Sequence, residues 1–176
     1  RYGLAHVSDR FFRSPSKELA LYGVTGTKGK TSTVYMLKAI LDKTGQKTGL
    51  ICTNQNMIGD KVLLAERTTP ESYDLQKMLR EMVDNSISSC VMEVSSQGLA
   101  LHRVALCEYE TAIFTNLSRD HIGPGEHKDM DDYARAKAKL FKMCKKGLIN
   151  MDSEYAPVMM RDASCKIYTY GIEREG

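Results

Sequence analysis

The stretch GVTGTKGKTST at residues 23–33 decides the fold of this chain, and it directly follows a short apolar run at residues 19–22. A strand that enters a glycine-rich turn and leaves through Gly-Lys-Thr into a helix is typical of phosphate-binding loops. In such a loop the backbone N–H groups face the phosphates, Lys30 supplies a mobile positive charge, and the hydroxyl of Thr31 can ligate Mg²⁺. The stretch therefore predicts a phosphate-binding α/β domain.

The glycine spacing of this loop departs from the general phosphate-loop pattern. That pattern has a glycine five residues before the glycine of Gly-Lys, but this position is Val24, and the glycines stand at 23 and 26 instead. The chain has the narrower variant TGTxGKT and no NKxD-type base reader. An ordinary P-loop kinase or GTPase is therefore disfavoured.

The composition is typical of a globular domain, with 176 residues, 42% of them hydrophobic and 27% charged. A net charge of +3 is too small to indicate a nucleic-acid partner. No apolar run approaches the ~20 residues of a membrane span, and no signal peptide opens the chain. We therefore expect a cytoplasmic, monomeric protein without a membrane partner. The five cysteines contain no CxxC pair, so we expect reduced thiols instead of disulfides or a metal site.

Short apolar runs alternate with helical patterns along the chain. This alternation predicts an α/β fold of the P-loop type, with a mostly parallel sheet and helices on both faces. The predicted strands are 19–24, 48–53, 88–94, 110–115, 147–150 and 166–170. The predicted helices are 30–43, 72–85, 129–144 and 152–160. Residues 55–66 are predicted to form an antiparallel hairpin or excursion around Gly59 and Asp60.

Polar side chains stand at the predicted carboxyl ends of two strands, where open parallel sheets bind their ligands. Glu93 follows an apolar run and is placed to hold Mg²⁺ directly or through water, or else to cap the next helix. Asn116, Asp120 and His121 follow another apolar strand. A histidine just past a buried strand beside a nucleotide site favours a functional role, whereas His127 in a Gly/Pro loop is more typical of an exposed residue.

Lys137 interrupts the apolar stripe of the predicted helix 129–144. The inward positions at spacings of three and four are Met130, Tyr133/Ala134, Lys137, Leu140/Phe141 and Cys144. One interpretation is a stem that snorkels toward solvent. The other is a desolvated amine with a lowered pKa that reacts with CO₂, and the resulting carbamate would be an anionic metal ligand.

Taken together, the motifs resemble the central ATPase domain of the Mur ligase family, and in particular its members that add a diamino acid to UDP-N-acetylmuramoyl-L-alanyl-D-glutamate. The matching segments are VTGTKGKTST (24–33), TTPES (68–72), MEVSSQGLALHRV (92–104), FTNLSRDH (114–121) and YARAKAKLF (133–141). The resemblance implies that residues 18–176 form this domain, incomplete at its carboxyl end, and that residues 1–17 are a linker or the tail of a preceding UDP-binding domain.

The resemblance also implies a reaction and the residues that serve it. ATP would phosphorylate a free carboxylate of the UDP-muramoyl dipeptide, and the amine of the diamino acid would then attack the acyl phosphate. The residues matching the ATP site are Gly26, Thr27, Lys28, Gly29, Lys30, Thr31 and Ser32. Those matching the contacts to the UDP-muramoyl peptide are Thr68, Thr69, Ser95 and Arg103.

Two Mg²⁺ ions are implied by the same resemblance. Thr31 and Glu93 would hold the first ion, and His121 with a carbamylated Lys137 would serve the second. Lys30, Lys137 and His121 would be the catalytic residues. On its own, without the UDP-binding and amino-acid-binding domains of the family, this fragment is expected to be inactive.

Several positions depart from the family pattern, and other functions stay open. Lys28 stands where many members have Asn, Gln97 replaces a frequent His, and Leu101 replaces a Gln that contacts substrate. A folylpolyglutamate synthetase or cyanophycin-type relative has the same phosphate loop and also forms an amide through ATP. The segments TTPES (68–72) and EVSSQGL (93–99) disfavour this alternative. A nucleotide-binding paralogue without catalysis is the non-enzymatic alternative. Whether diaminopimelate or lysine is the diamino acid stays open.

Overall fold

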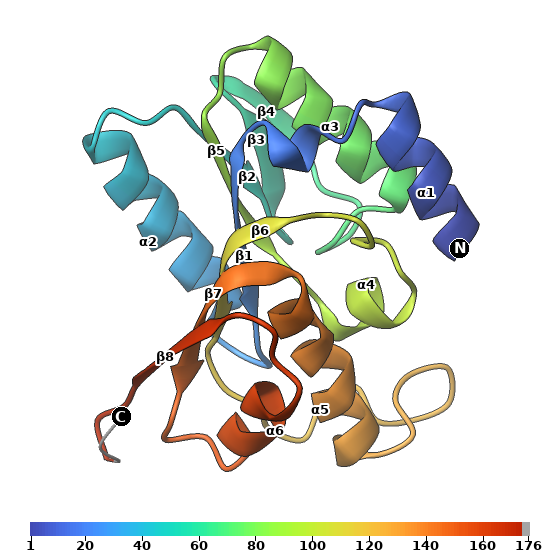
Figure 1. The fold of residues 1–176 in the computed structure, drawn as a ribbon, viewed down its shortest axis with the longest axis vertical. Helices are drawn as coiled ribbons and strands as arrows, with labels where there is room; N and C mark the ends of the chain where they lie inside the picture. The colour runs from blue at the N-terminus through green and yellow to red at the C-terminus, as the bar shows by residue number, and fades with distance from the viewer. Residues whose placement is uncertain (174–176) are drawn as a thin grey trace.

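A computed structural model describes residues 1–173, which form one eight-stranded sheet with helices on both faces (Figure 1). The strands are β1 (Ala20–Thr25), β2 (Thr48–Ile51), β3 (Gln55–Ile58), β4 (Lys61–Leu64), β5 (Ser89–Glu93), β6 (Tyr109–Phe114), β7 (Cys144–Asn150) and β8 (Lys166–Tyr170). The α-helices are α1 (Tyr2–Phe11), α2 (Lys30–Lys43), α3 (Ser72–Asp84), α4 (Ser96–Ala100), α5 (Met130–Ala138) and α6 (Ala156–Arg161). The 3₁₀ helices are η1 (Pro15–Lys17) and η2 (Lys139–Lys142).

The sheet has the strand order β4-β3-β2-β5-β1-β6-β7-β8. The six strands from β2 to β8 in this order pair in parallel, and the β3–β4 hairpin, which turns at Gly59, adds two antiparallel strands at one edge. The α/β fold with a mostly parallel sheet is thus confirmed, as is the hairpin. In the register, Val24 lies beside Glu93 and Thr25 beside Phe114, so the carboxyl ends of β5, β1 and β6 meet at one edge.

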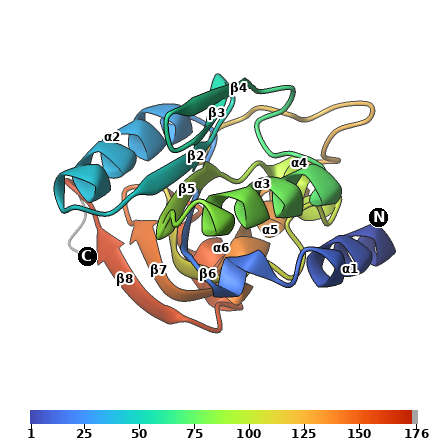
Figure 2. The same ribbon diagram turned by 90° about the horizontal axis from the view of Figure 1, so that it is seen from above.

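Helix α2 lies on one face of the sheet, and the other helices lie on the opposite face (Figure 2). The smaller core under α2 joins Val34 to Val24, Leu50 and Val91, all fully buried. The larger core under the other helices includes Leu75, Leu79, Tyr133, Phe114 and Phe141. Fully burying an aliphatic or aromatic side chain contributes ~1.5–3 kcal/mol, so both faces hold the strand ends in place.

The predicted helix 129–144 is wrong at its carboxyl end. Helix α5 stops at Ala138, the 3₁₀ helix η2 follows, and Cys144 already belongs to β7, which was expected to begin at residue 147. Helical spacing persists through η2, since both Leu140 and Phe141 are buried, so the apolar stripe alone does not reveal the change. Pairing of Cys144 with Tyr109 extends the strand at its start.

Two further helix predictions need correction. The helix expected at 152–160 begins at Ala156, because Asp152 and its neighbours form a turn in which the backbone N–H of Asp152 donates to Asn150 Oδ1 at 3.0 Å. The short helix α4 was not predicted. Its N-cap is Ser95, whose side-chain oxygen accepts from the backbone N–H of Gly98 at 3.0 Å.

Residues 1–17 pack against the domain through α3. Ala5 of α1 is fully buried, and Arg80 of α3 donates from Nε to the carbonyl of Phe12 at 3.0 Å and forms an ion pair with Glu18. Among residues 1–173, no helix is both long and apolar enough to cross a bilayer.

Candidate active site

The phosphate loop lies between β1 and α2, and its glycines are required by its backbone. Gly26 has φ +150°, and a Cβ there would lie 2.0 Å from Thr115 Oγ1. Gly29 has φ +82° and is the N-cap of α2, without a side-chain capping hydrogen bond. The first turn of α2 contains no acidic residue. The N-terminus of a 14-residue helix is therefore open to an anion, as a phosphate site requires.

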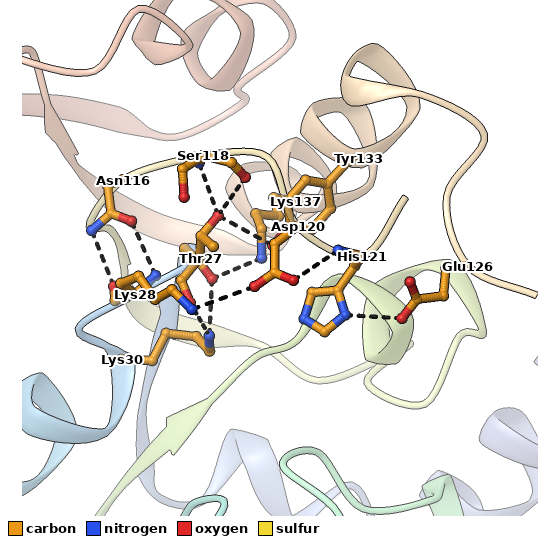
Figure 3. A network of polar contacts seen from close by, with 11 residues as sticks. Thr27, Lys28, Lys30, Asn116, Ser118, Asp120, His121, Glu126, Tyr133 and Lys137 are labelled. Carbon is orange, nitrogen blue, oxygen red and sulfur yellow. Dashed lines mark hydrogen bonds and ion pairs between the residues drawn. The ribbon is translucent and has the colours of Figure 1, made fainter. Parts of the chain in front are cut away.

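The loop is tied to the segment that follows β6 (Figure 3). The Asn116 side chain accepts from the backbone N–H of Lys28 at 3.0 Å and donates to the carbonyl of Lys28 at 3.1 Å. The Thr27 hydroxyl accepts from the backbone N–H of Ser118 at 3.0 Å and lies 3.3 Å from the hydroxyl of Tyr133. The sequence predicts Asn116 at this strand end but carries no signal for its two hydrogen bonds to the backbone of Lys28, which hold the loop against the end of β6.

Two lysines meet at one carbonyl of the loop. Lys30 Nζ donates to the carbonyl oxygens of Gly26 and Thr27, both at 3.0 Å, and Lys137 Nζ donates to the same Gly26 oxygen at 2.9 Å. Lys137 Nζ also lies 4.5 Å from the centre of the Tyr133 ring. Figure 3 shows both amines directed at the phosphate loop. A residue of α5 therefore contacts the phosphate loop directly.

Burial lowers the pKa of both amines. Lys137 is 1% exposed, so its stem does not snorkel to solvent. Burial and, to a smaller extent, the positive charge of Lys30 lower its pKa to about 7, against the opposing charge of Asp120. Burial also lowers the pKa of Lys30, against the opposing charge of Glu93. Of the two interpretations of Lys137, the desolvated amine is the one that the structure favours.

Glu93 ends β5 beside the start of α2 and is 1% exposed. Its Oε1 accepts from the Thr31 hydroxyl at 2.8 Å and from the backbone N–H of Thr53 at 3.1 Å, and its Oε2 accepts from the Thr53 hydroxyl at 3.2 Å. A hydroxyl and a carboxylate at this distance fit Mg²⁺, which takes one or two protein oxygens and completes its shell with phosphate and water. Within residues 1–173, no three His, Cys, Asp or Glu side chains are grouped so that they could hold a metal ion.

His121 lies in the loop after β6 and is exposed. Its backbone is left-handed, with φ 53°, and its Nδ1 lies 3.1 Å from Glu126 Oε1. The backbone N–H of His121 donates to Asp120 Oδ1 at 3.0 Å, and this bond together with Lys28 lowers the pKa of Asp120. His127, expected to be exposed, is 4% exposed instead, because its ring packs on Tyr133 and pairs with Asp132.

Three of the residues expected to contact the acceptor, Thr69, Ser95 and Arg103, are joined by hydrogen bonds. Thr69 Oγ1 donates to the carbonyl of Glu93 at 3.0 Å and accepts from the backbone N–H of Ser95 at 2.9 Å. Arg103 Nη1 donates to the carbonyl of Thr69 at 3.3 Å, and the hydroxyls of Thr68 and Thr53 lie 3.0 Å apart. These bonds join the segment before α3 to the strand that carries Glu93.

One cavity of about 340 Å³ brings most of these side chains together. Its lining includes Lys30, Thr31, Glu93, His121 and Lys137 together with Thr68, Thr69, Ser95 and Arg103. Ser32, by contrast, is exposed on α2 and does not line it. Thr53, Arg67 and Tyr133 also line the cavity and were not assigned to the site from the sequence. For Thr53 a signal existed, since it is the last residue of the predicted strand 48–53.

Comparisons with known proteins identify relatives of this chain. Residues 24–176 match the family model described as the Mur ligase middle domain. The chain is 49% identical over 174 residues to the UDP-N-acetylmuramoyl-L-alanyl-D-glutamate--2,6-diaminopimelate ligase of Caldanaerobacter subterraneus subsp. tengcongensis, and 44% identical over 174 residues to that of Clostridium botulinum. These alignments cover 98% and 99% of this chain but 36% of each relative.

The chain is also similar to a solved structure. That structure is described as a UDP-N-acetylmuramoyl-L-alanyl-D-glutamate--2,6-diaminopimelate ligase, and it superposes with a TM-score of 0.84 at 29% identity. The match covers 97% of this chain and 36% of that structure. The chain thus spans little more than a third of the length of the relatives that it matches.

Proposed function

Because the chain belongs to the Mur ligase family, we propose that it is the ATP-binding part of a ligase that joins a diamino acid to UDP-N-acetylmuramoyl-L-alanyl-D-glutamate in peptidoglycan precursor synthesis. The names of the relatives favour 2,6-diaminopimelate as the diamino acid. The observation that carries the proposal is one cavity lined both by Lys30 and Thr31 at the phosphate loop and by residues that match the acceptor contacts. ATP and the UDP-linked peptide are cytoplasmic molecules, so we place the protein in the cytoplasm.

The residues of the phosphate loop would bind and orient the triphosphate of ATP. The open N-terminus of α2 directs backbone N–H groups toward the phosphates, and the amine of Lys30 follows the transferred phosphoryl group. Phosphoryl transfer depends mostly on position and charge neutralisation, which these groups supply. A carboxylate oxygen of the acceptor takes the γ-phosphoryl group and ADP leaves. The amine then displaces phosphate from the acyl phosphate and loses a proton as the amide forms.

Thr31 and Glu93 would hold a Mg²⁺ ion, which neutralises charge on the transferred phosphate when bound. Their 2.8 Å hydrogen bond shows that both oxygens reach one point beside the loop. Thr53, which donates twice to Glu93, orients this carboxylate. Removing the Thr53 hydroxyl should therefore weaken metal binding without removing a metal ligand.

Lys137 would act as a carbamate. Its neutral amine adds CO₂ and releases one proton, giving an anionic oxygen at the end of a long stem. A pKa of about 7 leaves about half of the amine neutral at pH 7, whereas an ordinary lysine is almost wholly charged there. The change also converts repulsion between Lys137 and Lys30 into attraction. The carbamate and His121 would serve a second Mg²⁺ ion.

The reaction is tested with the full-length protein, by phosphate release from ATP in the presence of UDP-muramoyl dipeptide and either diaminopimelate or lysine. We expect turnover that depends on the dipeptide and a preference for diaminopimelate. Turnover with a folate and glutamate, but not with the dipeptide, would favour the folylpolyglutamate synthetase alternative. No turnover with any of these acceptors would favour the paralogue without catalysis.

The carbamate is tested separately. Lys137→Ala should abolish turnover, and added short-chain carboxylic acids should restore part of it by supplying the missing carboxylate. ¹³C-bicarbonate should produce a carbamate NMR signal in the wild type but not in Lys137→Ala. A wild type without this signal under turnover conditions, together with full activity of Lys137→Ala, contradicts the proposal.

A further inference from the structure

Glu71 occupies the N-cap position of α3 but does not cap the helix. Its Oε1 instead lies 2.9 Å from Arg103 Nε, 3.8 Å from Arg67 Nε and 3.7 Å from Arg1 Nη1. An acidic residue at this position ordinarily turns its side chain toward the backbone N–H groups of the first turn. Here the carboxylate does not accept from these N–H groups and instead forms ion pairs with three guanidinium groups.

Arg103 is held on two sides by this arrangement. Its Nε pairs with Glu71, its Nη1 donates to the carbonyl of Thr69 at 3.3 Å, and its side chain is only 10% exposed. The hydroxyl of Ser72 donates to the carbonyl of His102 at 3.4 Å, which joins the start of α3 to the segment that carries Arg103. The Nε and Nη1 contacts of the guanidinium therefore both depend on residues 69–72.

The cluster carries more positive charge than its own members neutralise. One carboxylate faces three arginines, and both Arg67 and Arg103 line the cavity of about 340 Å³. The positive charges of Arg67 and Arg1 and the burial of Arg103 all lower the pKa of Arg103, and Glu71 opposes them. Like charges at close range are unfavourable unless an anion joins them. An excess of positive charge in such a cluster does not by itself stabilise the fold.

We propose that Glu71 is a positioning residue for the acceptor, which fixes the Arg103 guanidinium at the cavity wall so that it receives an anionic group of the UDP-muramoyl dipeptide. This inference rests on the proposed function of the cavity. Glu71 acts through Arg103 and does not touch the acceptor. Arg67 adds a second, more exposed positive charge at the same wall.

Loss of Glu71 has two opposite effects on the acceptor, and the structure indicates which is larger. Removing a negative charge strengthens the attraction of the wall for an anion, but this gain is screened because the Glu71 side chain is 30% exposed. Removing the carboxylate oxygen that forms the ion pair with Nε at 2.9 Å releases one of the two contacts that orient a nearly buried guanidinium. Misplacement of a binding group costs affinity steeply, so the positioning effect is the larger.

The test measures steady-state kinetics of the full-length protein. Glu71→Ala should raise the KM for UDP-muramoyl dipeptide about tenfold or more, with kcat changed less than about threefold and the KM for ATP unchanged. Glu71→Gln should raise the dipeptide KM less, because the amide keeps a polar oxygen beside Arg103 Nε although the ion pair is lost. Glu66→Ala removes a neighbouring exposed carboxylate outside this cavity and should leave all three constants unchanged.

A double-mutant cycle tests the route through Arg103. Glu71→Ala combined with Arg103→Ala should raise the dipeptide KM no more than Arg103→Ala alone. A dipeptide KM of Glu71→Ala equal to that of the wild type would overturn the inference. So would a dipeptide KM of Glu71→Gln below that of the wild type, or additive effects of the two substitutions on the dipeptide KM in the double variant. Equal increases in the KM for ATP and in the KM for the dipeptide would also overturn it, since they indicate a role in folding only. A wild type that does not use the dipeptide defeats the proposed function, and with it this inference, whereas the other results leave the function intact.

Discussion

Replacing Lys137 by methionine should make the domain more stable at neutral pH, although it should remove ligase activity. Methionine has a similar volume and no charge, so it fills the same site without a cavity. The groups around the Lys137 amine are Lys30, the Gly26 carbonyl, the Tyr133 ring and Asp120. Lys30 continues to donate to the Gly26 oxygen at 3.0 Å, so this carbonyl keeps a partner in the variant.

The expected gain follows from the pKa of Lys137, which falls from 10.5 in the unfolded chain to about 7 in the folded protein. Between these values the unfolded chain binds a proton that the folded protein does not, so the free energy of unfolding of the wild type rises with pH. At ~1.4 kcal/mol per pH unit, the penalty is roughly 4 kcal/mol at pH 7, where half of the folded amine is neutral. Losing the hydrogen bond of the amine costs ~1 kcal/mol, so the net gain is about 3 kcal/mol.

The assay is urea unfolding of residues 1–176, wild type and Lys137→Met, in CO₂-depleted buffer with a reductant. The difference between the two proteins should be about 3 kcal/mol at pH 7 and under ~1 kcal/mol near pH 9.5, where most of the wild-type penalty has disappeared. Other titrating groups are common to both proteins and cancel. Lys139→Met, which changes an exposed lysine of η2, should shift stability by less than ~0.5 kcal/mol at either pH.

Two results would refute this reasoning. A Lys137→Met variant less stable than the wild type at pH 7 would mean that the charged amine is well solvated or paired in the folded protein. A gain of the same size at both pH values would mean that it comes from packing instead of from the lowered pKa. Either result would also remove the main physical support for carbamate formation.

Three further predictions concern the phosphate loop. Lys30→Ala should reduce ligase turnover of the full-length protein by several orders of magnitude while its thermal unfolding stays close to that of the wild type, and wild-type turnover would contradict the assignment of Lys30. Gly26→Ala should destabilise the domain by more than ~2 kcal/mol in urea unfolding, because its Cβ would lie 2.0 Å from Thr115 Oγ1; a change below ~0.5 kcal/mol would show that the loop relaxes freely. Residues 1–176 alone should bind ATP·Mg weakly and show no ligase activity, and submicromolar affinity in calorimetry would show that they contain the adenine contacts as well.

Much of the fold and several site residues could be predicted from the sequence because they depend on local patterns. Alternating apolar runs and helical stripes indicated the parallel sheet, and the loop spacing indicated Gly26, Gly29 and Lys30. The polar residues after the strands indicated where Glu93 and His121 would lie, since parallel strands end at one edge. The resemblance added Thr69 and Arg103, whose own sequence neighbourhood carries no chemical signal.

The sequence by itself determined that Lys137 points inward from a helix, but only the tertiary structure decided how deep its amine lies and what it contacts. Helical periodicity specifies a face and not a distance, so it could not separate snorkelling from full burial. The same limit holds for Asn116 on the loop and for Glu71 among its arginines, which come from segments far apart in the chain. Such contacts depend on how β1, β5 and β6 are ordered in the sheet, because strand order brings together side chains that no local pattern connects.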